Sequence, residues 1–316
     1  MRTKLLLLLF VVFSVTPTAD GKTFTFHDGD RIVFLGNSFF ERAIDAGCIE
    51  AMLTLAWPEY KLTFRNLGWD GDTIYGHSRA GGRRRAVFGD VEEGFQRMVQ
   101  HVNSLSPSIV VLAYGYNESF AGDEGLDRFT RGLVRLTSEI GDAKTRFVLL
   151  SPIRVQLPSS KTSVLDAKLQ EHLTKRNDQL ERYVSALQSF ANSKGHRFVD
   201  LFHDDGLHNG LSEDGIHPTE SGYRRIAKVV ERQLDLPASK FWSLEEKAKV
   251  QLREAIVHKN TLYFHRWRPR NDAFVYGERK SEQEIAQQEP EQLEPFISQQ
   301  EQRIRKLIDG IGGAAQ

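Results

Sequence analysis

Residues 31–40 read Arg-Ile-Val-Phe-Leu-Gly-Asn-Ser-Phe-Phe, and this stretch decides the fold. Its apolar run, Arg31–Leu35, has the length of a buried β-strand. The following residues, Glu41–Trp57, predict a helix, because apolar side chains recur on one helical face. Those side chains are Ile44, Cys48, Met52 and Leu55. The stretch therefore predicts a strand, a tight turn and a helix, which is the first unit of an α/β fold.

Ser38 stands in the turn between the predicted strand and the predicted helix. A turn of this kind can lift a serine above the edge of a sheet, where it is exposed as a nucleophile. The helix start adds free backbone N–H groups that favour a developing anion. Serine is also a favoured N-cap residue, so a purely structural role stays open on this stretch alone.

A second motif, Asp214-Gly215-Ile216-His217-Pro218, lies far along the chain. A nucleophilic serine needs a base for its proton, and the base needs a carboxylate that fixes its tautomer. Asp214 and His217 are close enough in sequence for one loop to bring both to a serine. Pro218 suits the first turn of the helix predicted over Thr219–Leu234. Taken singly, the motif is also typical of a turn with a capping carboxylate.

Together these stretches resemble the four sequence blocks of the SGNH/GDSL hydrolase family. The four blocks are Phe34–Ser38, Asn66-Leu67-Gly68, Gly115-Tyr116-Asn117-Glu118 and Asp214–Pro218. Their order and spacing fit the family, and the resemblance covers roughly residues 24–236. Asn37 departs from the usual aspartate of the first block, which puts the hydrogen bonding around the serine in question. Glu118 replaces the aspartate of the third block.

The resemblance implies a serine esterase that works through an acyl-enzyme and needs no metal or organic cofactor. It assigns the catalytic triad to Ser38, His217 and Asp214. It assigns the oxyanion hole to the backbone N–H groups of Ser38 and Gly68 and to the side-chain amide of Asn117. The family includes carbohydrate deacetylases, lipases, thioesterases and arylesterases, so the resemblance alone does not choose a substrate.

The loops around the predicted site favour an esterase that removes acetyl groups from a polysaccharide. They are polar, aromatic and rich in arginine, and no broad apolar lid is evident in the sequence. A lipase is expected to expose a larger apolar surface for its acyl chain. Two alternatives stay open: a lipase or acylhydrolase acting on lipid esters, and a catalytically weak or inactive protein that binds carbohydrate or a partner.

From Thr23 onward, short apolar runs alternate with helical periodicity. This pattern predicts a parallel sheet of about five strands covered by helices on both faces, the flavodoxin-like three-layer sandwich of the family. The predicted strands are Arg31–Leu35, Lys61–Asn66, Ser108–Tyr114, Arg146–Ser151 and Arg197–Leu201. The further predicted helices are Val91–Leu105, Gly125–Ile140, Asp166–Ser193 and Thr219–Leu234. All the candidate site residues follow strands at the carboxyl edge, where ligands bind in such sheets.

Residues 1–19 have the pattern of a signal peptide. Arg2 and Lys4 precede the apolar run Leu5–Val15, and Ala19 is a suitable last residue before cleavage. The run is too short for a comfortable membrane span. We therefore expect an exported protein, secreted or periplasmic, with no stable membrane span after cleavage. A retained membrane anchor is the alternative.

The overall charge argues against two classes of partner. Lys plus Arg and Asp plus Glu number 42 each, so the formal net charge is zero. Bulk electrostatic binding to nucleic acid or to an anionic membrane is therefore not expected. Cys48 is the only cysteine, which excludes an internal disulfide, and its place on an apolar helix face predicts burial. The sequence leaves the oligomeric state open.

Three other polar stretches are weaker candidates for chemistry. Gly76–Ala80 nearly spells the nucleophile elbow G-x-S-x-G, but no apolar strand leads into Ser78. Four nearby arginines can bind an anionic substrate group, although a solvated basic loop is the favoured interpretation. They are Arg79, Arg83, Arg84 and Arg85. Potential metal ligands that lack a known ligand spacing occur at His203, Asp204, Asp205 and His208, so we expect no metal site.

Residues 237–316 form an extension beyond the resemblance, whereas residues 20–236 make up the hydrolase domain. Helical patterns are predicted over Leu244–Val257 and Ile297–Leu307. Between them lies an aromatic and basic stretch that contains Tyr263, Phe264 and Trp267. We expect these aromatic side chains to pack against the hydrolase domain, because a free cluster would expose a large apolar patch. Lining a sugar-binding surface or contacting a partner are the alternatives.

Overall fold

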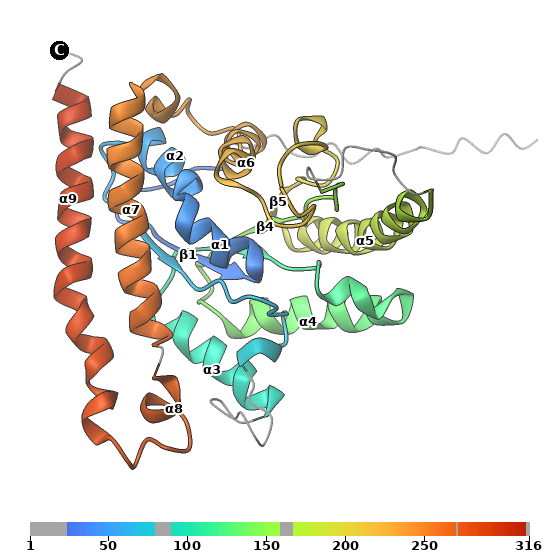
Figure 1. The fold of residues 1–316 in the computed structure, drawn as a ribbon, viewed down its shortest axis with the longest axis horizontal. Coiled ribbons are helices and arrows are strands. Elements are labelled where there is room, and N and C mark those ends of the chain that lie inside the picture. The colour runs from blue at the N-terminus through green and yellow to red at the C-terminus, as the bar shows by residue number, and fades with distance from the viewer. Residues whose placement is uncertain (1–23, 80–89, 159–166, 270, 314–316) are drawn as a thin grey trace, which may run out of the picture.

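The computed structural model describes residues 24–79, 90–158, 167–269 and 271–313 (Figure 1). The predicted signal peptide lies outside them. Five strands form one parallel sheet in the order β2-β1-β3-β4-β5. The strands are β1 (Arg31–Gly36), β2 (Thr63–Asn66), β3 (Ile109–Ala113), β4 (Arg146–Leu150) and β5 (Arg197–Val199). The five predicted strands and their parallel arrangement are confirmed.

Helices cover both faces of this sheet, as Figure 1 shows. Those before residue 234 are α1 (Ser38–Ala46), α2 (Cys48–Ala56), α3 (Val91–Ser104), α4 (Leu126–Glu139), α5 (Ala167–Lys194) and α6 (Glu220–Gln233). They are followed by α7 (Glu246–Trp267), α8 (Asp272–Val275) and α9 (Glu294–Gly313). Within the described residues, none of these helices combines the length and apolar character needed to cross a membrane.

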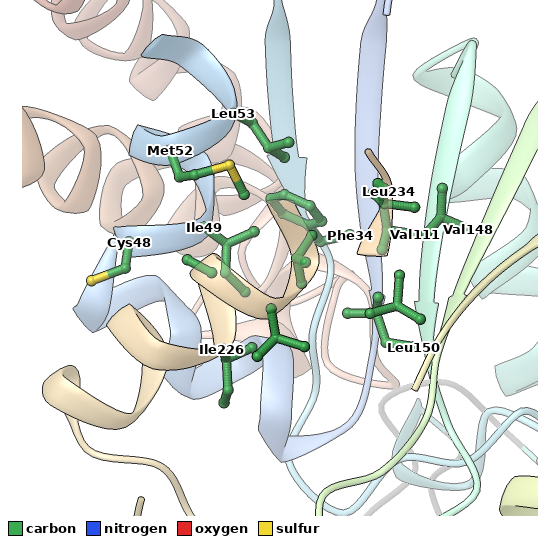
Figure 2. Close-up of a cluster of buried hydrophobic side chains, with 14 of the residues drawn as sticks. Phe34, Cys48, Ile49, Met52, Leu53, Val111, Val148, Leu150, Ile226 and Leu234 are labelled. Atoms are coloured by element: carbon green, nitrogen blue, oxygen red, sulfur yellow. The ribbon is translucent and has the colours of Figure 1, made fainter. Parts of the chain in front are cut away.

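The side chains of the central strands alternate between two cores. Phe34 and Val111 face the side of α2 and α6, where Figure 2 shows them packed with Met52 and Ile226. The next residue along β1, Leu35, faces the opposite core, which α3, α4 and α5 cover. Strands buried on both faces read as continuous apolar runs, which is why the sequence located them. The sheet is therefore the middle layer of a three-layer sandwich.

The helix predicted over Glu41–Trp57 is wrong as a single element, because α1 and α2 are separate helices. Gly47 between them has a φ of 63°, in the left-handed region that favours glycine. Its N–H donates to the carbonyl oxygen of Ala43 at 3.0 Å and closes α1. The apolar periodicity continues into α2, whose first residue Cys48 is 1% exposed, so the pattern did not reveal the break. The predicted burial of Cys48 is confirmed.

The C-terminal helices pack on the edge of the sandwich. In Figure 1, α7 and α9 run side by side next to α1 and α2. Ala255 and Ile256 of α7 share an apolar cluster with Leu55 of α2. The predicted helix Leu244–Val257 was too short, because α7 continues through the aromatic stretch to Trp267. Tyr263 and Trp267 are 2% and 5% exposed and join the core on the other face of the sheet.

A buried ion pair fixes how α7 meets α2. Lys259 Nζ donates to Glu50 Oε1 at 2.6 Å, and Asn260 Nδ2 donates to Glu50 Oε2 at 2.9 Å. Lys259 is 2% exposed and Glu50 is 5% exposed. Burial lowers the pKa of Lys259 even though Glu50 opposes the effect. Because another register of α7 would leave a charge buried and unpaired, the pair specifies the docking of the extension.

Substitution of Lys259 tests this arrangement. Lys259→Met leaves the Glu50 charge buried without its partner, so the free energy of unfolding should fall by roughly 3–5 kcal/mol. Glu50→Leu combined with Lys259→Met leaves no unpaired charge and should recover much of the loss. Arg279→Met, which removes the exposed pair with Glu282, should change stability far less. Urea denaturation measures all three, and a fully stable Lys259→Met variant would contradict the role of the pair.

Candidate active site

The turn after β1 presents Ser38 as the first residue of α1. A Cβ atom at Gly36 would lie 2.7 Å from the carbonyl oxygen of Ala113 on β3, so glycine is required for this close approach. Asn37 is the N-cap, and its side-chain oxygen accepts the Phe39 N–H at 3.0 Å. The capping alternative for Ser38 is therefore wrong. Asn37 supplies the cap and leaves the Ser38 hydroxyl for other contacts.

Two residues of the segment after β2 contact the Ser38 hydroxyl. Ser38 Oγ donates to Asp70 Oδ1. The backbone N–H of Gly71 faces the same oxygen at an N···O distance of 3.4 Å. Gly71 has a φ of 72°, and this left-handed conformation is what glycine permits. A backbone donor beside the nucleophile is the geometry needed to stabilise negative charge on a reacting carbonyl oxygen.

Asp214 and His217 form the second half of the site. His217 Nδ1 lies 2.6 Å from Asp214 Oδ2. Asp214 Oδ1 accepts the N–H groups of Ile216 and His217 at 2.9 and 2.8 Å and the Ser212 hydroxyl at 2.7 Å. Partial burial alone would raise the pKa of Asp214, but these hydrogen bonds and the His217 ring hold it far below its ordinary value. Asp214 is therefore a fixed carboxylate that orients the imidazole.

Ser38 and His217 line one small cavity. Its volume is about 50 Å³, and it lies where β1, β3, β4 and the loop before α6 meet. Much of its wall is apolar or aromatic, contributed by Phe39, Tyr114, Tyr116, Pro152, Ile153 and Ile216. The structure thus brings three sequence-predicted residues together: Ser38, His217 and, through His217, Asp214. Among the described residues that line this cavity, neither Gly68 nor Asn117 is found.

The structure contradicts the oxyanion-hole assignment of Gly68. The Gly68 N–H donates to Asn66 Oδ1 at 2.8 Å in the protein interior, so it is not available to a substrate. A Cβ atom at Gly68 would lie 2.2 Å from the Glu41 backbone nitrogen, which shows that this glycine serves close packing. The backbone donor that does face the nucleophile belongs to Gly71. The sequence could not distinguish Gly71 from Gly68, because residue identity does not reveal which glycine adopts a positive φ.

Asn117 and Glu118 tie the third block to the segment after β2. Asn117 Nδ2 donates to the carbonyl oxygen of Asp72 at 2.7 Å, which leaves the second N–H of the amide for a ligand. The Glu118 carboxylate accepts the N–H groups of Ile74 and Gly115 at 2.8 and 2.7 Å. Its burial raises the pKa of Glu118 to about 7 in spite of these hydrogen bonds. Both residues thereby position the two loops relative to each other.

The weaker candidates have structural roles where they are described. Arg79 is 2% exposed and binds Asp72 Oδ2 at 2.8 Å, so it is not a free anion-binding group. Arg83, Arg84 and Arg85 lie outside the described residues. Ser78 Oγ donates to the Asp70 carbonyl at 2.9 Å within a short 3₁₀ turn, not a nucleophile elbow.

The other weak candidates are the potential metal ligands of the loop that contains His203 and His208. In the described part of the chain, no group of three or more His, Cys, Asp and Glu side chains is arranged to hold a metal. The two ring nitrogens of His203 are 2.8 Å from Asp200 Oδ2 and 2.7 Å from Glu181 Oε1. Partial burial lowers the pKa of His203, but these two carboxylates raise it overall.

Sequence reasoning missed a residue that reaches the site from α7. Arg268, directly after α7, binds Glu41 Oε2 through Nη1 at 2.8 Å. The same carboxylate oxygen of Glu41 accepts the backbone N–H of Asp70. The Arg268 guanidinium also lies 3.9 Å from the centroid of the Trp69 ring. Because Glu41 is on α1, one carboxylate joins the helix of Ser38, the segment of Gly71 and the end of α7.

Trp267 supports the same segment from beside Arg268. Its ring meets Trp69 edge-on at 5.5 Å between centroids. The Arg79 guanidinium lies beside both rings, 5.3 Å from the Trp69 centroid and 5.4 Å from the Trp267 centroid. Arg79 also donates to the Leu67 carbonyl oxygen at 2.7 Å. The segment that carries Asp70 is therefore held against α1 by residues at the C-terminal end of α7.

Comparison with known proteins places this site in a family. Residues 32–230 match the model of the GDSL-like Lipase/Acylhydrolase family. Three solved structures are similar. A catalytic mutant of the acetylxylan esterase Axe2 from Geobacillus stearothermophilus is 15% identical, with a TM-score of 0.47, over 67% of this chain and 96% of that chain. A GDSL-like lipase (BT0569) from Bacteroides thetaiotaomicron VPI-5482 is 18% identical, with a TM-score of 0.41, over 65% of this chain and 88% of that chain.

The third similar structure is BT4096, described as a gut microbial diltiazem-metabolizing enzyme. It is 20% identical, with a TM-score of 0.46, over 67% of this chain. The chain spans 48% of the length of BT4096. A search of curated proteins found no match.

Arg268→Ala tests the support from α7. Loss of the guanidinium frees Glu41 and Trp69, so the Asp70–Gly71 backbone should shift, and misplacement of about 1 Å costs on the order of 10²-fold in rate. We expect the rate at which a fluorophosphonate probe labels Ser38 to fall roughly 10- to 100-fold.

Arg266→Ala is the matched control. Arg266 lies one residue before Trp267 but binds Glu291 and Glu294 within the extension, so its loss should leave labelling unchanged. Equal labelling rates in the Arg268→Ala and Arg266→Ala variants would exclude a positioning role for Arg268. Circular dichroism of both variants separates this effect from unfolding.

Proposed function

Because the chain belongs to the GDSL-like lipase/acylhydrolase family of ester-hydrolysing enzymes, we propose that it is an exported serine esterase that removes acetyl groups from a carbohydrate. One observation carries the proposal. Ser38 and His217 line the same cavity, and His217 is bound to a carboxylate, Asp214, at 2.6 Å. Nucleophile, base and orienting acid are the three parts of a serine-hydrolase triad.

In the proposed mechanism, Ser38 Oγ attacks the ester carbonyl carbon while His217 Nε2 takes the serine proton. Asp214 holds Nδ1 and stabilises the imidazolium that forms. The carbon–oxygen bond to the alcohol then breaks, His217 returns the proton to the leaving alcohol, and the acyl group stays on Ser38. Water attacks this acyl-enzyme with His217 again as the base, which releases the carboxylic acid and restores the serine.

The oxyanion of the tetrahedral intermediate needs donors on the side of the segment after β2. We assign them to the backbone N–H groups of Ser38 and Gly71 and to the second N–H of the Asn117 amide. In this proposal Gly71 replaces Gly68, to which the family resemblance had assigned the role. Before attack, the Ser38 hydroxyl must turn its hydrogen from Asp70 to His217, which is a local rotation about one side-chain bond.

The size of the cavity supports a short acyl group. One water molecule needs about 10–15 Å³ of such a volume, so a cavity of about 50 Å³ has room for a few waters or for a short group such as acetyl. A long acyl chain needs an extended apolar surface beyond it. A panel of p-nitrophenyl esters tests this point, and activity that rises with acyl length would favour the lipase alternative.

Export rests on residues 1–19 alone. Their basic start and short apolar run are the pattern of a cleaved signal peptide. N-terminal sequencing of the protein recovered outside the cytoplasm tests the proposal, and a mature chain that still begins at Met1 would overturn cleavage.

Substitution of the triad tests the reaction. Ser38→Ala and His217→Ala should abolish hydrolysis of p-nitrophenyl acetate, and Asp214→Asn should lower kcat by about 10⁴-fold because the imidazole takes the wrong tautomer. Ser78→Ala, at the near-match to the nucleophile elbow, should keep most of the activity. Normal turnover by Ser38→Ala would overturn the serine mechanism, and a wild-type protein that neither hydrolyses esters nor is labelled by fluorophosphonate would support the binding-protein alternative.

Asn117→Ala tests the oxyanion hole. The proposed contact forms only as the carbonyl oxygen gains charge, so kcat should fall while KM stays nearly constant. Loss of one such donor typically costs about 10²–10³-fold in kcat. Steady-state kinetics with p-nitrophenyl acetate separates the two constants. A loss confined to KM would instead make Asn117 a ground-state substrate contact.

A further inference from the structure

An exposed phenylalanine lies at the rim of the candidate active site. Phe120, in the short 3₁₀ helix Glu118–Ala121, is 64% exposed although burial of its ring would be favourable. Its ring meets the Tyr116 ring edge-on, with 5.7 Å between centroids. Tyr116 also lines the cavity of Ser38 and His217. The exposed Phe120 ring therefore contacts a residue, Tyr116, that lines the same cavity as Ser38 and His217.

Arg176 on α5 packs against one face of the Phe120 ring. Its guanidinium carbon lies 3.9 Å from the Phe120 ring centroid and 5.0 Å from that of Tyr116. Its Nη2 atom donates to the Tyr116 carbonyl oxygen at 3.0 Å and to the Ser119 hydroxyl at 2.7 Å. Ser119 itself is fully buried. One face of the Phe120 ring is therefore covered by a fixed cation, and the ring is held in place before any ligand arrives.

A wide groove with charged side chains in its lining begins at this ring. Its volume is about 830 Å³, far larger than the cavity beside Ser38. Its charged lining consists of Asp123, Glu124, Asp178, Lys175, Arg176 and Arg182. Carboxylates and cations are equal in number, so neither a polyanion nor a polycation is favoured. The lining therefore offers hydrogen-bonding side chains together with apolar surface, and a sugar chain, which has hydroxyl groups and C–H faces, can use both.

We propose that Phe120, backed by Arg176, is a sugar-binding platform for a neutral polysaccharide. The acetylated sugar presents its ester to Ser38, the neighbouring sugar places its C–H face on the exposed ring, and the chain continues along the groove. An exposed aromatic ring supplies flat apolar contact with little loss of side-chain entropy, while the groove satisfies hydroxyl groups. This inference rests on the proposed esterase function and specifies the alcohol part of its substrate.

The test compares three substrates that share the acetyl group: p-nitrophenyl acetate, an O-acetylated monosaccharide and an O-acetylated neutral oligosaccharide. Phe120→Ala should lower kcat/KM for the oligosaccharide about tenfold, the size of an aromatic contact of roughly 1.4 kcal/mol. It should leave hydrolysis of p-nitrophenyl acetate unchanged. Phe120→Trp keeps a flat ring and should retain the preference for the oligosaccharide.

Phe296→Ala is the matched control, because Phe296 is also an exposed phenylalanine, at 55%, but lies on α9 in the C-terminal extension. It should behave as wild type on all three substrates. Equal losses on all three substrates in Phe120→Ala would show an effect on the catalytic groups and overturn the platform, as would wild-type kinetics on the oligosaccharide. In the panel of p-nitrophenyl esters, a loss in Phe120→Ala confined to long acyl chains would assign the ring to a lipid instead.

The same measurements separate the two proposals. Wild-type hydrolysis of p-nitrophenyl acetate that disappears in Ser38→Ala supports the esterase function independently of the platform. If that activity is present but the wild type does not prefer the oligosaccharide to the monosaccharide, only the platform is overturned. If the wild type hydrolyses no ester, the esterase function and the platform are overturned together.

Discussion

The active-site geometry depends on the close contact between Gly68 and the first turn of α1. A Cβ atom at this position would lie 2.2 Å from the Glu41 nitrogen and 2.5 Å from the Phe40 carbonyl carbon, so any side chain would push the two segments apart. Asn66 strengthens the contact, because its side chain accepts the Gly68 N–H and donates to the Phe40 carbonyl oxygen, both at 2.8 Å. The residues that follow are thereby brought to Ser38 at the start of the same helix.

A second constraint comes from outside the family match, which ends at residue 230. Arg268 contacts Glu41 and Trp69 at the end of a helix whose position is fixed by the buried pair of Lys259 and Glu50. Glu41 and Arg268 are separated by 227 positions in the sequence, and neither has a local pattern that marks a partner. The family match covers all the candidate catalytic residues, whereas the support that Arg268 gives to the segment after β2 comes from beyond its end.

The sequence predicts features that depend on local pattern. Buried parallel strands are continuous apolar runs, and the short spacing of Asp214 and His217 lets one loop set their geometry, so both could be located. Features that depend on backbone conformation could not be located from the sequence. The break at Gly47 and the choice of Gly71 over Gly68 both turn on which glycine adopts a positive φ, and on where its N–H then points. Residue identity alone leaves that undetermined.

Under the proposed function, Asp70 must release the Ser38 hydroxyl before the reaction begins. Its carboxylate accepts the Ser38 hydroxyl, whereas attack requires that proton to pass to His217. A negative charge beside a developing oxyanion also raises the free energy of the transition state unless donors surround it. The proposed donors are the backbone N–H groups of Ser38 and Gly71 and the second N–H of the Asn117 amide. Holding the segment of Asp70 and Gly71 against α1 therefore matters in two ways: it places the Gly71 N–H beside Ser38, and it fixes the carboxylate whose charge that donor must offset.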